Sequence, residues 1–401
     1  MSIFGVWMWP HSVAVSGAEK AAALCADIGI SDIYFLTKGL SGIASCRSAF
    51  APQDDDRDLL AELLQTAHAR GIRVHAWLTS TSDEHYKHLF PDSGRCHYTR
   101  GKDKGLIALT DCGYLSYMEQ FVRELCRNYA IDGLHLDYIR YNHLLYGWSK
   151  DDQARYAASG ADIAHLRRLM DKTFISNQDP NAIFDAYRSG DESVLALAQV
   201  RRLDVLRFAQ ALTACARAER KELILSAALM PEGAYDDLAF SDLHYGQSYQ
   251  DAAGLYDYVL PMAYSHAYRK DSRWVRSVAE GTLKKGLRAV MGLHAYDGGT
   301  AASLHADMHA LGQIPVCGVC LFRFGAFAVA IPDGASLRII NPLDQPITSV
   351  TSAGGDALLG GALAPGCETR IPLPPTCSLL RAFCGDSEIC LYTADQITTK
   401  K

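Results

Sequence analysis

The residues best suited to acid–base chemistry lie in one short segment, 131–141. Apolar residues alternate there with Gly133, His135 and Asp137, which predicts a buried strand. Burying an ionised carboxylate is costly unless partners compensate, so packing alone does not explain Asp137. With Arg140 and a long loop after it, Asp137 is placed where a barrel enzyme keeps its catalytic groups.

A glycosidic bond is hydrolysed by two carboxyl groups that flank it. Asp137 is the expected first acid, with a structural ion pair as the alternative. Glu232 is the preferred second acid, although it could be a solvated loop residue, and Asp297 is its rival. A separation of about 5–5.5 Å predicts a retaining enzyme with Asp137 as nucleophile, and about 6.5–9.5 Å predicts inversion. We expect Asp132 to form a turn and Asp111 to cap a helix.

Strands and helices alternate through residue 324 and must position these acids. Strands are expected at 3–9, 32–37, 72–78, 131–141, 223–229, 258–264, 288–293 and 316–322. Helices are expected at 17–28, 55–70, 114–129, 191–218, 271–285 and 300–311. This order predicts an α/β fold, a (β/α)8 TIM barrel. A doubly wound sheet would want a glycine-rich turn after the first strand, where Trp7-Met8-Trp9-Pro10 stands instead.

The expected domains are a barrel over 1–331, with a long insertion at about 142–190, and a small antiparallel β domain over 332–401. Long loops in compact domains are usually functional, so the insertion is interpreted as a wall of the substrate cleft. A merely tolerated insertion is the alternative. We interpret the β domain as a structural cap, with a carbohydrate-binding module as the alternative.

The C-terminal ends of barrel strands share one face, and polar or aromatic residues recur at these ends. Indole and phenol rings stack on the apolar faces of sugars, whereas hydroxyls need polar partners. The expected substrate-binding residues are Trp7, Trp9, Lys38, His75, Trp77, His135, Arg140, Tyr264, His294, Asp297 and Arg323.

Arg201 adds a candidate from helical periodicity, because it falls on an apolar stripe between Val194 and Cys215. A buried cation needs an anion, so we expect Arg201 or Arg202 to reach a carboxylate or the substrate. Extension of the side chain to solvent is the alternative.

The segment 132–142 resembles the DGIHLDYIRYP signature of a bacterial family of glycosyl-hydrolase-like (β/α)8 barrels, long described as a domain of unknown function. Every position matches or is conservatively replaced except the last, where Asn142 replaces proline. Weaker similarities at 5–7, 71–77, 257–264 and 318–322 occur in the family's order. The resemblance covers roughly residues 3–325 and implies a barrel that acts on carbohydrates. An Arg in the helix before the fifth strand also resembles the family.

Composition narrows the class of partner. The net charge is −6 and the pI about 6.1, without a basic cluster that would indicate nucleic acid. No apolar run is long enough to span a membrane, and no signal peptide is visible, so we expect a cytoplasmic protein, although a trimmed secreted form would look the same. The scattered cysteines are expected to be reduced, and Cys317 and Cys320 are interpreted as strand residues rather than half a zinc site. No cofactor or metal is expected, and the oligomeric state is not indicated.

The sequence is also compatible with two other functions. One is a carbohydrate-binding barrel without turnover. The other is a metal-dependent hydrolase using His75, His135, Asp137 and His294, although the first strand lacks the His-x-His that such enzymes often place there.

Overall fold

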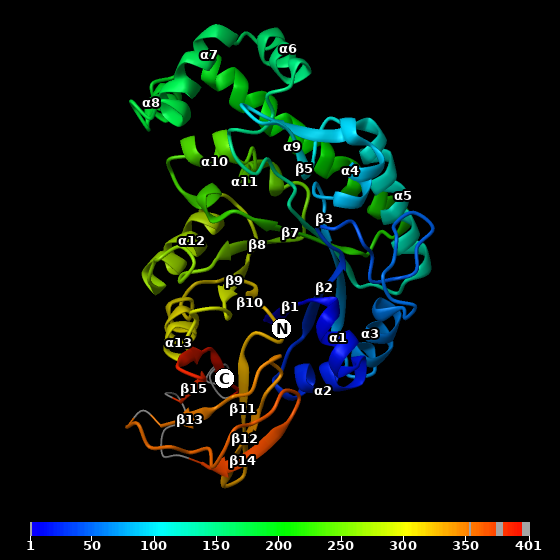
Figure 1. Cartoon of the computed structure of the whole chain (residues 1–401), viewed down its shortest axis with the longest axis vertical. Helices are drawn as coiled ribbons and strands as arrows, with labels where there is room; N and C mark the ends of the chain where they lie inside the picture. Colours follow the sequence, from blue (N-terminus) through cyan, green and yellow to red (C-terminus); the bar gives the residue numbers. More distant parts are fainter. Residues whose placement is uncertain (1, 353, 374–379, 395–401) are drawn as a thin grey trace.

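The computed structural model describes residues 2–352, 354–373 and 380–394, and its centre is a closed parallel barrel (Figure 1). The strands follow one another around the barrel in the order β1-β10-β9-β8-β7-β6-β3-β2. Their bounds are β1 Ile3–Met8, β2 Asp32–Lys38, β3 Arg73–Thr79, β6 Gly133–Asp137, β7 Ile224–Leu229, β8 Tyr258–Ala263, β9 Val290–His294 and β10 Gly318–Phe322. The predicted (β/α)8 barrel is therefore confirmed.

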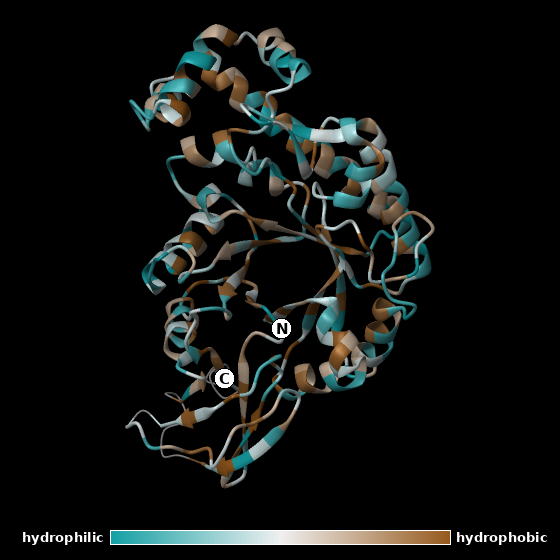
Figure 2. Cartoon of the chain, viewed as in Figure 1, coloured by the Kyte–Doolittle hydropathy of each residue, from teal (hydrophilic) through white to brown (hydrophobic). Residues whose placement is uncertain are grey.

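Helices cover the outside of the barrel, and hydrophobic and hydrophilic residues alternate along them (Figure 2). In α5, for example, the buried residues Tyr114, Met118, Phe121 and Leu125 recur at helical spacing. Asp111 caps this helix, as predicted, by accepting a hydrogen bond from the Tyr114 amide. The helices around the barrel are α1 Pro10–Ser16, α2 Ala18–Asp27, α3 Leu59–His68, α4 Glu84–Leu89, η1 Pro91–Ser93, α5 Cys112–Asn128, α9 Glu192–Glu219, α10 Ala239–His244, α11 Tyr249–Ala252, α12 Ser272–Lys284 and α13 Ala301–Ala310.

The strand that carries Asp137 is central, because β6 pairs with β3 on one side and with β7 on the other. Its first residue, Gly133, makes room for a ring inside the barrel. A Cβ atom there would lie 2.1 Å from Nδ1 of His75. The absence of a side chain therefore lets His75 fill the interior beside β6.

Two additions interrupt the barrel on the C-terminal side of its strands. The first is the hairpin of β4 Gly94–His97 and β5 Gly101–Ile107 after β3. The second follows β6 and contains α6 Lys150–Ala158, α7 Ile163–Met170, η2 Asp171–Ile175 and α8 Ala182–Arg188. These helices project beyond the barrel (Figure 1) and share a separate apolar core with the first half of α9, whose second half joins the barrel core. One long helix thus anchors the insertion to the barrel.

The C-terminal region is a pair of small sheets packed on the barrel. One has the strand order β14-β12-β11-β17 and the other β13-β15-β16. Their bounds are β11 Ala328–Asp333, β12 Ser336–Ile340, β13 Ser349–Thr351, β14 Glu368–Pro372, β15 Arg381–Cys384, β16 Ser387–Ile389 and β17 Leu391–Thr393. The β11 strand spans the expected domain boundary and runs parallel to β17. The sequence of the small β domain also predicts a strand at 378–383, and the first two residues of that range lie outside the described residues.

Among the described residues, no helix combines the length and apolar content that crossing a bilayer would require. The described cysteines are all free thiols, and Cys320 lies buried in β10 as the strand interpretation predicted.

Candidate functional site

Asp137 is the last residue of β6, and three donors hold its carboxylate at the rim of the barrel. The Trp77 indole donates to Oδ2 at 3.2 Å. The Tyr138 backbone amide and the Arg140 guanidinium donate to Oδ1 at 2.6 and 3.2 Å. The residue is only 5% exposed, so these groups replace water as its partners. The structure thus gives Asp137 a fixed orientation.

The turn after β6 fixes this orientation further. Tyr138 has a left-handed backbone with φ of 55°, which is rare for a residue with a bulky side chain. Its carbonyl accepts hydrogen bonds from the Thr81 hydroxyl and the Arg140 amide. The Ser80 amide donates to the carbonyl of Asp137 at 2.7 Å, and the Arg140 guanidinium lies 4.4 Å from the centre of the Tyr138 ring. Contacts from the β3 side therefore maintain a backbone shape that costs about 1–3 kcal/mol by itself.

Glu232 lies in η3, Pro231–Ala234, directly after β7, and it is largely buried. Burial raises the pKa of its carboxyl group above the usual value. Its own backbone amide, the hydroxyls of Tyr268 and Tyr245, and the charge of Arg140 oppose this rise without cancelling it. The Tyr268 hydroxyl lies 3.4 Å from Oε2. Glu232 is thus inclined to keep a proton at a pH where an ordinary glutamate has lost it.

Arg140 connects the two acids. It pairs with Asp137, and its positive charge also acts on Glu232. Because β6 and β7 are neighbours in the barrel, Asp137 at the end of β6 and Glu232 just after β7 lie at the same rim. Two carboxyl groups in such different surroundings are suited to acid and nucleophile or base roles.

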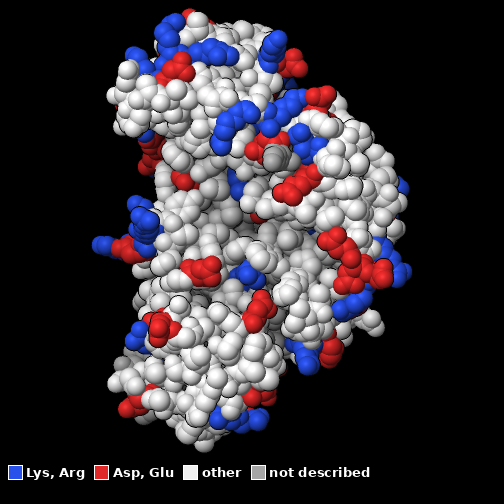
Figure 3. Space-filling view, viewed as in Figure 1, with Lys and Arg blue, Asp and Glu red and all other residues white. Residues whose placement is uncertain are grey.

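An aromatic wall continues from this pair along the ends of β8, β9 and β10. The rings of Tyr264 and Tyr296 have centroids 6.1 Å apart, and each also contacts Phe322. Arg323 lies 3.6 Å above the ring of Trp9, which is 37% exposed. The space-filling view shows the molecule hollowed over the middle of the barrel, with acidic and basic groups deep in the hollow (Figure 3). The expected rim positions of Trp9, Tyr264 and Arg323 agree with this arrangement.

His294 and Asp297 lie at the end of the β9 unit but differ in exposure. His294 is 2% exposed, stacks on Tyr296 with a centroid distance of 4.0 Å, and has a pKa lowered by burial. Its Nε2 lies 3.0 Å from the backbone carbonyl of Asp297. The side chain of Asp297 is exposed and lines a pocket toward the C-terminal sheets, together with Tyr296.

Trp7, His75 and His135 are placed inside the barrel rather than at its rim, which corrects the expected substrate contacts. All three are at most 1% exposed. The Trp7 indole donates to Nε2 of His135 at 3.2 Å, and Nδ1 of His135 lies 2.9 Å from the Ser226 hydroxyl. Burial lowers the pKa of His135 well below its usual value, so its ring is neutral. These side chains form the polar interior of the barrel.

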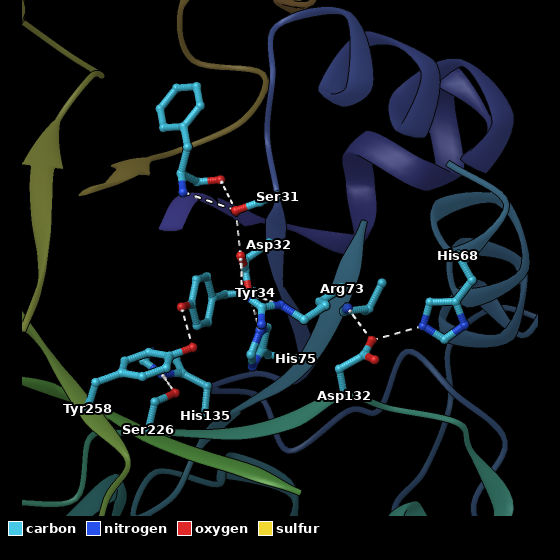
Figure 4. Close-up of polar contacts among 12 residues, drawn as sticks. Ser31, Asp32, Tyr34, His68, Arg73, His75, Asp132, His135, Ser226 and Tyr258 are labelled. Carbon is cyan, nitrogen blue, oxygen red and sulfur yellow. Dashed lines mark hydrogen bonds and ion pairs between the residues drawn. The ribbon is translucent and has the colours of Figure 1, made fainter. Parts of the chain in front are cut away.

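The same interior continues to the N-terminal end of the strands (Figure 4). His75 lies 2.8 Å from the carboxylate of Asp32, to which Arg73 donates two hydrogen bonds. Burial raises the pKa of Asp32, but the hydrogen bonds of His75 and Arg73 outweigh it and lower the pKa to about 2. Asp132 accepts hydrogen bonds from His68 and the Val74 amide, in the structural role expected of it.

Lys38 is the last residue of β2, but its side chain is engaged inside the protein. Its ammonium group lies 2.7 Å from Asp83, and both side chains are completely buried. The register of β2 against β3 shifts between Leu36 and Lys38, and the Lys38 ammonium lies near Tyr114 of α5. The expected substrate contact is therefore replaced by an internal ion pair.

Arg201 is fully buried on α9, as its stripe predicted, but its partners are not carboxylates. It donates to the backbone carbonyls of Tyr146, His143 and His244, and its guanidinium lies 3.8 Å from the ring centre of Tyr141. Contrary to expectation, Arg201 is therefore not placed to contact a substrate, because its guanidinium connects the insertion to α10. Arg202, the other arginine of that expectation, does reach a carboxylate, because it forms a bidentate pair with Asp251.

Sequence reasoning missed Tyr245 and Tyr268, which surround Glu232. They come from loops after β7 and β8, where no periodic pattern marks a position. Gln247 was missed as well, although it fixes the same loop by accepting from the Met230 amide and donating to the Ile139 carbonyl. The only signal was a concentration of aromatic residues shortly after strand ends.

The four residues considered for a metal site do not converge. His75 and His135 are engaged inside the barrel, whereas Asp137 and His294 lie at the rim. Across residues 2–352, 354–373 and 380–394, no three His, Cys, Asp or Glu side chains gather as metal ligands would.

No protein-family model and no curated protein sequence matches the chain. Membership of the family with the DGIHLDYIRYP signature therefore stays a prediction. Solved structures do match the fold. The glycoside hydrolase domain of PgaB (BpsB) from Bordetella bronchiseptica has a TM-score of 0.64 at 14% identity, covering 80% of this chain and 94% of that one.

Two further glycosidases share the barrel. The catalytic domain of β-amylase from Paenibacillus polymyxa has a TM-score of 0.58 at 11% identity, covering 80% of this chain and 92% of that one. A β-galactosidase from Marinomonas ef1 has a TM-score of 0.57 at 13% identity, covering 80% of this chain and 54% of that one. At such identities the similarity establishes the fold alone, a TIM barrel that these glycosidases share.

Proposed function

We propose that the protein is a glycoside hydrolase that cleaves a glycosidic bond in an oligo- or polysaccharide, with Glu232 as general acid and Asp137 as nucleophile or base. One observation carries the proposal. Two carboxyl groups lie at the C-terminal ends of adjacent strands, one held by three donors and the other with a pKa raised by burial. Hydrolysis of a glycosidic bond needs such a pair.

In the proposed reaction, Glu232 gives its proton to the glycosidic oxygen as the bond from that oxygen to the anomeric carbon breaks. The negative charge of Asp137 stabilises the positive charge that develops on the sugar ring. Asp137 then either bonds to the anomeric carbon, to be displaced by water, or draws a proton from a water that attacks directly. Water supplies the new hydroxyl group in both cases.

The neighbouring side chains support these roles. Arg140 and Trp77 keep the Asp137 carboxylate in one orientation, which lowers the entropic cost of reaching a reactive geometry. Trp9, Tyr264 and Tyr296 offer aromatic surfaces to the apolar faces of sugar rings. Burial raises the pKa of Glu232, which is the direction that favours a general acid.

The proposal is tested by screening aryl glycosides and oligosaccharides with the wild type and with Asp137→Asn and Glu232→Gln. Hydrolysis is expected in the wild type, with a loss of roughly 100- to 10,000-fold in each variant. Circular dichroism must show that the variants are folded. Turnover that both substitutions leave intact would contradict the assignment, and sugar binding without turnover in the wild type would favour a binding barrel. Loss of turnover in chelator would favour the metal-dependent alternative.

A further inference from the structure

A second hollow lies where the loops after β9 and β10 meet the C-terminal sheets, and the catalytic roles above do not use it. Its volume is about 280 Å³. The barrel contributes Tyr296, Asp297 and Arg323 to its lining, and the C-terminal region contributes Asp344, Gln345 and Glu388. The pocket therefore exists only because the two parts of the chain pack together.

Neighbouring side chains hold two of its polar groups, Arg323 and Glu388, whereas Asp344 and Gln345 are exposed. The Arg323 guanidinium stacks on Trp9 at 3.6 Å and is half-buried. Arg381 donates to the Glu388 carboxylate, and Asp344 lies 3.3 Å from Nε2 of His11. Several acceptors beside one guanidinium donor suit a ligand that carries many hydroxyl groups, each of which can donate or accept a hydrogen bond. Three carboxylates around one guanidinium disfavour an anion such as phosphate.

The pocket is continuous with the aromatic wall of the candidate active site. Tyr296 lines the pocket and contacts both Tyr264 and Phe322. The Tyr264 side chain in turn lies within reach of the Asp137 charge, which raises its pKa in addition to the larger effect of burial. A ligand that is bound at Asp137 and extends along this wall arrives at the pocket.

We propose that this pocket is a remote subsite for one sugar unit of an oligosaccharide whose scissile bond lies at Asp137 and Glu232. The proposal rests on the glycosidase function and adds that the substrate is a chain longer than a disaccharide. The pocket's volume of about 280 Å³ lies near the lower end of the range for ligand pockets, about 300 Å³, which suits one sugar unit rather than several. The C-terminal sheets thereby become part of substrate recognition.

The test uses the full chain with Asp137→Asn, which prevents turnover, and calorimetric titration with defined sugars. The probes are β-1,4-linked oligomers of glucose, N-acetylglucosamine and galactose, from disaccharide to hexasaccharide. We expect one series to bind at least about tenfold more tightly beyond a certain length, as one added polar anchor would give. Adding Asp344→Asn and Gln345→Ala should bring the affinity of the longest oligomer down to that of the disaccharide. The control Asp333→Asn, whose side chain pairs with Arg370 on the C-terminal sheet, should leave the length dependence unchanged.

Affinity that does not change with length, or that survives the paired substitution, overturns the subsite, and so does a failure of every oligomer to bind. The outcome is separable from the catalytic proposal, because aryl monoglycosides do not need the pocket. If the wild type hydrolyses aryl monoglycosides but the Asp137→Asn variant binds oligomers of every length equally well, only the subsite is refuted. If the affinity depends on oligomer length but the wild type hydrolyses no substrate, the subsite is supported and the catalytic proposal is refuted.

Discussion

At the scale of single residues, the two candidate acids differ in what surrounds them. Asp137 accepts hydrogen bonds from an indole, a guanidinium and a backbone amide. For Glu232, burial has the largest effect on the pKa of the carboxyl group. The second acid was harder to select from sequence because Glu232 and Asp297 both follow strands. The structure separates them, since Glu232 is buried beside tyrosine hydroxyls and Asp297 is exposed near the C-terminal sheets.

Tyr268 provides a prediction about pH. Its hydroxyl donates to Glu232 and favours the charged carboxylate, so Tyr268→Phe should raise the pKa of Glu232 further. A general acid works only while protonated, and activity falls as the pH rises through its pKa. The alkaline limb of kcat/KM against pH should therefore move to higher pH.

The matched control is Tyr235→Phe, because the Tyr235 hydroxyl accepts from the Trp274 indole rather than donating to Glu232. Its alkaline limb should stay in place. A downward shift in Tyr268→Phe, or equal shifts in both variants, would refute Glu232 as the acid that sets this limb.

At the scale of elements, strand alternation predicted which side chains face the barrel interior but not their depth. His135 and Asp137 point the same way along β6, yet only Asp137 reaches the rim. Two residues of strand separate their positions by about 6.6 Å, which is enough to place His135 in a lower layer. The same reasoning separates His75 from the strand end on β3. Alternation alone does not indicate how far along the barrel axis a side chain lies.

Lys38 and Arg201 show two other features that strand alternation and helical periodicity do not predict. A register shift beside Lys38 alters the alternation, and sequence gave no sign of this irregularity. For Arg201 the helical stripe correctly predicted burial. The pattern could not distinguish carboxylate partners from backbone carbonyls, because those carbonyls come from the insertion and from α10.

Arg201 and Arg202 offer a comparison of neighbouring residues. Arg201→Met should lower the free energy of unfolding by about 3 kcal/mol or more, since three buried carbonyls lose a charged donor. Arg202→Met removes a partly exposed ion pair with Asp251 and should cost under about 1 kcal/mol. Urea unfolding monitored by circular dichroism measures both. Equal losses would contradict the anchoring role of Arg201.

At the scale of the whole molecule, the C-terminal sheets take a place that a helix occupies after the other strands of the barrel. In the described part of the chain, β10 leads directly into β11, and α13 packs against β17. Tyr392 of β17 contacts Phe4 of β1 and Phe327 before β11, with centroids 5.5 and 6.5 Å away. Sequence separated the β region from the barrel by composition, but it could not show this shared core.

Shared packing predicts shared unfolding. Tyr392→Ala should destabilise the protein by about 3–5 kcal/mol, because it removes a buried ring between the two parts. Wild type and variant should each show a single thermal transition in calorimetry. Two separate transitions in the wild type would indicate that the sheets and the barrel are independent units.

The central claim is that Glu232 protonates the leaving group while Asp137 acts at the anomeric carbon. Hydrolysis rates of an oligosaccharide and of a 2,4-dinitrophenyl glycoside of the same sugar, each measured for Glu232→Gln and Asp137→Asn, test it most directly. Dinitrophenolate leaves without a proton, so Glu232→Gln should lose roughly 100- to 10,000-fold on the oligosaccharide and far less on the aryl glycoside. Asp137→Asn should lose activity on both substrates. Equal losses by Glu232→Gln on the two substrates would contradict the account.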